Sequence, residues 1–137
     1  MFVSTFELFK IGIGPSSSHT VGPMRAARRF IERCDEAGVL NRITRIRITL
    51  FGSLAHTGRG HGTDHAIILG LEGYQPDQVN IDLIPKIIER VTSSKNLYLN
   101  QNISIPFCFK TDIRFEKRRK LQLHSNGMLF TAFDQGD

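Results

Sequence analysis

Apolar residues recur with two different periods along the chain, and each period predicts a different kind of element. Between residues 22 and 36 they are spaced by three and four positions, which predicts an amphipathic helix. Thr20 can cap the first amides of this helix, and Pro23 fits its first turn. Gly38 marks its end, because helices commonly stop at a glycine.

Two more helices are predicted further along the chain. Residues 62–72 are almost continuously apolar after Asp64, which predicts a buried helix. Residues 82–94 carry a stripe of isoleucine and valine. We expect Asp82 to cap this last helix and Pro85 to lie in its first turn.

Residues 43–51 instead show the two-residue period of a strand with one buried and one exposed face. After the last helix the chain contains three more strand-like segments: residues 103–109, 112–116 and 127–133. A single helical turn is expected at residues 5–10. This order of elements predicts an α+β fold, a two-layer domain in which a mixed β-sheet carries helices packed mainly on one face.

Composition narrows the class of protein. A length of 137 residues, 40% of them apolar and 23% charged, suits one globular domain. No apolar run approaches the roughly 18 residues of a membrane span, and no signal peptide is evident, so we expect a cytoplasmic protein with no membrane partner. The net charge of +5 does not predict a nucleic-acid partner, because the arginines of the 22–36 helix are interleaved with Glu32 and Asp35.

The two cysteines, Cys34 and Cys108, fall in segments predicted to be a helix and a strand. We expect both to be buried thiols. Iron–sulfur clusters usually need about three or four thiolates, so this chain alone is expected to hold no cluster and no other metal.

The first segment with candidate chemistry is GPSSSHT, residues 14–20. It places hydroxyl groups and an imidazole directly before a predicted helix, where free amides and the helix dipole attract anions. We expect a carboxylate or phosphate to bind there, although a glycine-rich turn with a Ser/Thr cap would explain the same residues. The candidate side chains are Ser16, Ser17, Ser18, His19 and Thr20.

The second segment, residues 52–64, connects a predicted strand to the buried helix, and such connections often carry ligand-contacting groups. His61 would lie at the helix start, where the dipole favours the neutral imidazole that a general base requires. Capping the helix is the alternative role. His61 and His65 have the spacing of a helical zinc pair, but Gly62 stands where that motif needs glutamate, and His65 is expected to be a packing residue.

The third segment contains His124, Asn126 and Gly127. Asn-Gly alone indicates a turn. His124 could face the site if this turn lies beside the loops around residues 19 and 61, which the sequence leaves open.

Together the GPSSSHT segment, the GHGTD segment at residues 60–64 and the His-x-Asn-Gly-Met turn resemble the single-chain bacterial iron–sulfur L-serine dehydratases. The resemblance covers nearly the whole chain and implies that residues 1–137 are the amino-terminal (beta) domain of a longer polypeptide. It also implies a fold similar to the serine-binding regulatory domain of phosphoglycerate dehydrogenases.

The activity implied by this resemblance is that of an L-serine ammonia-lyase, which converts L-serine to pyruvate and ammonia in serine catabolism and gluconeogenesis. A 4Fe–4S cluster, bound by a separate alpha domain that this chain lacks, would act on the hydroxyl group, and pyridoxal phosphate would not be used. The full-length enzyme is expected to be a homo-oligomer, and the isolated chain inactive.

The resemblance also implies roles for individual residues. We expect His61, His19 and His124 to include the base that removes the Cα proton, with a preference for His61. Substrate-binding roles are expected for Ser16, Ser17, Ser18, Thr20, Ser53, Thr63, Asp64 and Asn126. The rival interpretation is a serine-binding regulatory module without catalytic residues.

Overall fold

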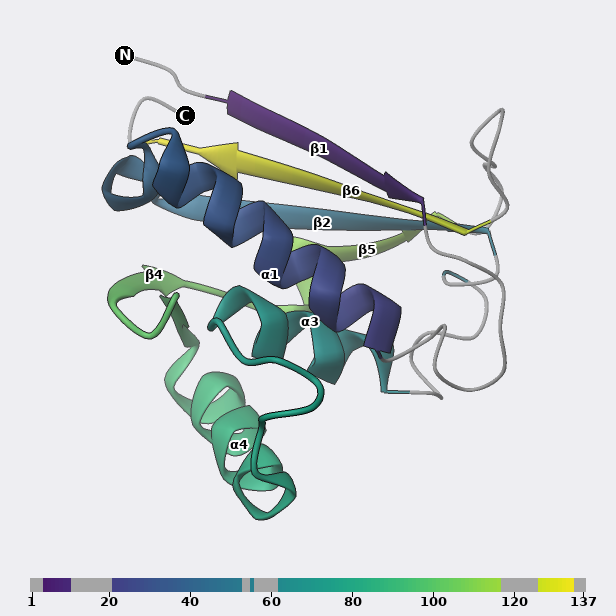
Figure 1. The fold of residues 1–137 in the computed structure, drawn as a ribbon, viewed down its shortest axis with the longest axis vertical. Coiled ribbons are helices and arrows are strands. Elements are labelled where there is room, and N and C mark those ends of the chain that lie inside the picture. The colour runs from purple at the N-terminus through teal and green to yellow at the C-terminus, as the bar shows by residue number, and fades with distance from the viewer. Residues whose placement is uncertain (1–3, 11–20, 53–54, 56–61, 117–125, 135–137) are drawn as a thin grey trace.

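A computed structural model of the chain describes residues 4–10, 21–52, 55, 62–116 and 126–134 (Figure 1). Its longer elements are β1 (Ser4–Lys10), α1 (Val21–Glu36), β2 (Arg45–Gly52), α3 (Thr63–Leu71), α4 (Ile84–Ser94) and β6 (Asn126–Phe133). Shorter elements are η2 (Leu40–Arg42), η4 (Ile81–Leu83), β3 (Asn96–Leu99), β4 (Ile103–Pro106), α5 (Phe109–Asp112) and β5 (Ile113–Glu116).

Four strands form a mixed sheet in the order β1-β6-β2-β5. β6 lies antiparallel between β1 and β2, and β5 runs parallel to β2. The strands β3 and β4 form a separate antiparallel pair. The helices α1 and α3 cover one face of the four-stranded sheet (Figure 1). The predicted α+β class, with a mixed sheet and helices mainly on one face, is therefore confirmed.

The core lies between α1, α3 and the sheet. β2 alternates as predicted, because Ile46, Ile48 and Leu50 are fully buried while Arg45 is exposed. The ring of Phe30 from α1 stacks on Phe130 from β6, with ring centroids 5.0 Å apart. Burial of these side chains is the main favourable term that holds the helices to the sheet.

Two of the predicted helices agree closely with the structure. Helix α1 is followed by Gly38 at φ +74°, a left-handed conformation that favours glycine. The expected burial of α3 is confirmed, since seven of its nine residues are buried. α4 begins with Pro85 in its first turn as expected, but Asp82 does not cap it. Asn80 caps the preceding 3-10 turn instead, by accepting a hydrogen bond from the amide of Asp82.

The helical turn predicted at residues 5–10 is wrong, because this segment is β1. The spacing of Phe6 and Phe9 fits one helical turn, yet every residue from Ser4 to Lys10 pairs with a residue of β6. These ladder hydrogen bonds satisfy backbone groups that an isolated turn would leave unpaired. β3 was not predicted, because four residues are too few for a clear period.

The strand predicted at residues 103–109 is shorter than expected. It ends at Pro106, which has no amide to donate to a ladder. Cys108 then precedes the short helix α5, where the Asp112 carboxylate accepts a hydrogen bond from the Cys108 amide at 2.8 Å. Cys108 is therefore half-buried at a helix start, and the prediction of a buried strand thiol is wrong, whereas Cys34 is buried as predicted.

Candidate active-site end of the sheet

Three chain segments with candidate chemistry adjoin one end of the four-stranded sheet. β1 ends at Lys10, before the first segment; β2 ends at Gly52, before the second; and β6 begins at Asn126, after His124. Gly127 pairs with Lys10 on one side and with Phe51 on the other. Adjacent strands are about 5 Å apart, so these strand ends lie within about 10 Å of one another.

The catalytic candidates His19, His61 and His124 lie outside the described residues, as do four hydroxyl candidates of the first segment and Ser53. The structure thus brings together the ends of the strands that carry these segments, and the roles of the individual side chains stay predictions. For Asn126 the structure describes the backbone, which pairs with Gly52 at the sheet end.

The start of α3 contains the two remaining candidates. Gly62 precedes the helix at φ +76°, a left-handed conformation that favours glycine in the GHGTD segment. Thr63 is fully buried at the first position. Asp64 is half-buried, and its Oδ1 accepts a hydrogen bond from the His65 amide at 2.9 Å. A carboxylate in the first turn also complements the helix dipole. Substrate binding by these two side chains stays a prediction.

His65 does not pack in the core, which corrects the expectation drawn from its apolar neighbours. Its side chain is exposed and meets the ring of Phe109 edge-on, with centroids 6.3 Å apart. It also lines a cavity of about 420 Å³ between α3 and α4.

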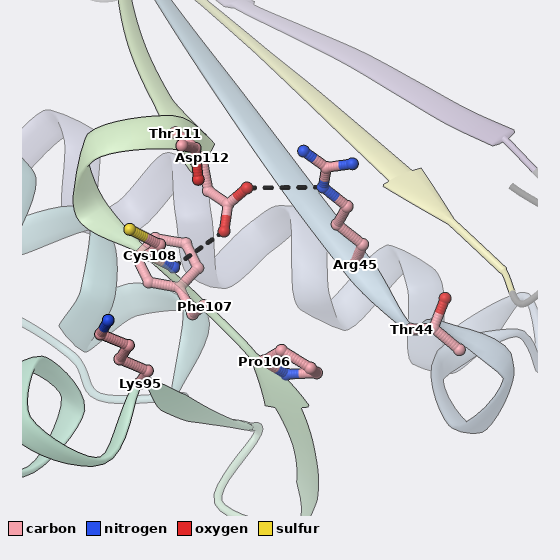
Figure 2. Close-up of a pocket in the computed structure, with 8 residues that line it drawn as sticks. All are labelled: Thr44, Arg45, Lys95, Pro106, Phe107, Cys108, Thr111 and Asp112. Atoms are coloured by element: carbon pink, nitrogen blue, oxygen red, sulfur yellow. Dashed lines mark hydrogen bonds and ion pairs between the residues drawn. The ribbon is translucent and has the colours of Figure 1, made fainter.

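A second cavity, of about 350 Å³, lies at the opposite end of β2 (Figure 2). Arg45, the first residue of β2, and Thr44 just before it contribute to this cavity. Arg45 lies about 23 Å from Gly52 at roughly 3.3 Å per residue. Its other lining residues are Lys95, Pro106, Phe107, Cys108, Thr111 and Asp112. None of the predicted site residues lies here, so this cavity is separate from the candidate active-site end.

Asp112 organises this second cavity. Its side chain is only 7% exposed, and Oδ1 lies 3.5 Å from Nε of Arg45. Hydrogen bonds from the backbone of Lys110, from the Thr111 side chain and from the Thr111 backbone lower the pKa of the Cys108 thiol, and the positive charge of Lys95 acts in the same direction. These contacts around Cys108 and Asp112 were not predicted from the sequence. The only sequence feature that points to them is the four-residue spacing of the two residues.

The described residues contain no group of three histidine, cysteine or acidic side chains that could hold a metal ion. Cys34 is buried in α1 and Cys108 precedes α5. Two thiols in separate elements do not fit a 4Fe–4S cluster. No helix in the described part of the chain is long and apolar enough to cross a membrane.

The fold and the clustered strand ends define a small α+β domain with polar segments at one end of its sheet. Residues 4–137 match the family model of the serine dehydratase beta chain, and the chain belongs to this family.

Relatives are similar over almost the whole chain. An L-serine dehydratase of Streptomyces coelicolor is 45% identical over 98% of this chain, and one of Haemophilus influenzae is 47% identical over 97%. L-serine dehydratase 1 of Escherichia coli is 45% identical over 96%. The chain spans only about 30% of the length of these relatives.

Proposed function

We propose that this chain is the beta domain of an L-serine ammonia-lyase, which converts L-serine to pyruvate and ammonia. The observation that carries the proposal is the family match over residues 4–137, together with identities of 45–47% to proteins named L-serine dehydratase. Because the chain spans about 30% of those relatives, the complete activity requires the remaining part of the polypeptide.

The geometry of the sheet supports this assignment. Elimination of water from serine requires one group that removes the Cα proton and others that hold the carboxylate and ammonium groups. The ends of β1 and β2 and the start of β6 are neighbours, and each adjoins a segment with a candidate histidine. The nearness of these strand ends supports the proposal that the three histidine-bearing segments contribute to one site.

A 4Fe–4S cluster is proposed to belong to the part of the polypeptide outside this chain, because Cys34 and Cys108 do not fit one. When bound, such a cluster would supply the Lewis acid that a leaving hydroxide needs. This chain would supply the general base and the side chains around the substrate. Ser16, Ser17, Ser18 and Thr20 are proposed to bind the charged groups of serine before the start of α1.

The test of the base uses the full-length enzyme that contains this domain. His61→Ala should lower kcat by about 10²–10⁴-fold, the usual contribution of a general base, and should abolish exchange of the Cα hydrogen with solvent. His19→Ala and His124→Ala are the matched variants. If exchange persists in His61→Ala and is lost in one of the others, the base is that residue.

A second measurement separates catalysis from regulation. Alanine at Ser16, Ser17 or Ser18 should raise KM for serine, since these hydroxyls are proposed to hold the substrate. If all histidine variants keep full kcat while serine still binds the domain, the domain is a regulatory module and the proposed function is rejected.

A further inference from the structure

An apolar surface surrounds the beginning of α4. Ile81 is 78% exposed and Leu83 is 43% exposed, so both stand out among the large apolar side chains of the described residues. They lead directly into α4, where Ile84, Pro85 and Ile88 line the cavity beside His65. The name α4 surface is used here for Ile81, Leu83, Ile84, Pro85, Ile88 and His65. Apolar residues that occur together on a surface, rather than singly, mark interaction sites.

Helix α4 packs against the domain along one side only. Ile87 and Val91 are buried there, and the half-buried Ile84 and Ile88 contact the core while also lining the cavity. The hydroxyl of Thr92 in the cavity wall donates to the Ile88 carbonyl at 2.8 Å, so it is already satisfied within the helix. The cavity therefore presents an apolar interior with one carboxylate, that of the exposed Glu89, on its wall.

The position of this surface suggests its occupant. His65 lies two residues after Thr63, at the start of α3, and so connects the cavity to the end of the GHGTD segment. More than two-thirds of each relative lies outside the region matched by this chain. On the proposed function, that remaining part must approach the histidine-bearing segments. The proposed function does not require a second copy of this domain to approach those segments.

We propose that the α4 surface is the docking site for the remaining part of the dehydratase polypeptide. An aliphatic or aromatic side chain of that part occupies the cavity between α3 and α4, with a basic side chain opposite Glu89. This inference rests on the proposed function for the identity of the occupant. Docking here buries Ile81 and Leu83, which removes from water the apolar area that the isolated domain leaves exposed.

The test measures the exposure of position 81 in the full-length enzyme. Ile81→Cys introduces a thiol on the α4 surface, and Ala37→Cys introduces one at an exposed position after α1 as the matched control. Alkylation is followed for each peptide by mass spectrometry, which separates these thiols from the native ones. Ile81→Cys should react about tenfold or more slowly than Ala37→Cys. Adding Leu83→Asp, which opposes docking by burying a charge, should restore fast alkylation at position 81.

Equal alkylation rates at positions 81 and 37 would overturn the docking proposal. Protection that disappears on dilution to a single polypeptide would also overturn it, because the occupant would then be a second copy. The readout does not depend on turnover. Full activity without protection would reject the docking site and keep the proposed function, whereas protection in an enzyme that does not act on serine would reject the function alone.

Discussion

Replacing Gly70 by alanine tests the close contact between α1 and α3. A Cβ atom at this position would lie 2.3 Å from the Met24 carbonyl oxygen, 2.7 Å from the Ala27 Cβ and 3.1 Å from the Arg28 amide nitrogen. Two of these three atoms belong to the backbone of α1, so no side-chain rotation can remove the clash. The two helices must move apart.

Two opposing terms decide the sign of the effect. In a helix, alanine is favoured over glycine by about 1 kcal/mol, so helix propensity alone predicts a more stable protein. Overpacking costs about 1–3 kcal/mol, and contact with a rigid backbone puts Gly70 at the upper end of that range. We therefore expect a net loss of about 2 kcal/mol, or about 8 °C in Tm for a domain of this size.

The measurement is urea and thermal unfolding followed by far-UV circular dichroism, with the wild-type chain as reference. The double variant Gly70→Ala/Ala27→Gly is the control. It removes the Cβ contact but leaves the Met24 carbonyl in place, so it should not recover stability. A Tm of Gly70→Ala equal to or above that of the wild type would refute the close packing of α1 on α3.

Three further predictions concern the rest of the described structure. Alkylation of Cys108 should reach half its maximal rate at a lower pH than alkylation of an unperturbed cysteine thiol, because its lowered pKa gives thiolate at lower pH. Thr111→Ala should move that midpoint upward, while the buried Cys34 stays unreactive in the native chain. Glu72→Ala should lower the free energy of unfolding in urea by about 2–3 kcal/mol, because the buried Glu72 carboxylate binds Arg90 and accepts a hydrogen bond from the Tyr98 amide at 3.0 Å. Glu72→Gln keeps a hydrogen-bond acceptor and should therefore lower the free energy of unfolding by less. Reconstitution of the 137-residue chain with iron and sulfide should give a colourless protein, and stoichiometric iron with charge-transfer absorbance would contradict this.

The local pattern of apolar and polar residues was sufficient to predict the elements in which burial follows a single period. α1 and β2 each place apolar residues on one face, and α3 is apolar almost throughout. Such patterns reflect where each residue must lie relative to the core, so they can be read without knowledge of neighbouring elements. The α+β class and the coverage of one sheet face followed from the same periods.

Tertiary contacts decided what the local pattern could not. Residues 4–10 form a strand because β6 offers a hydrogen-bonding partner along their whole length, and β6 lies more than 110 residues later in the chain. The turn at Cys108 depends on the Asp112 carboxylate rather than on hydrophobic spacing. The nearness of the strand ends at Lys10, Gly52 and Asn126 likewise arises from the sheet order. The sequence by itself determined the chemical groups of the candidate site, and the sheet decided which of their segments adjoin, because strand pairing links residues that no local period connects.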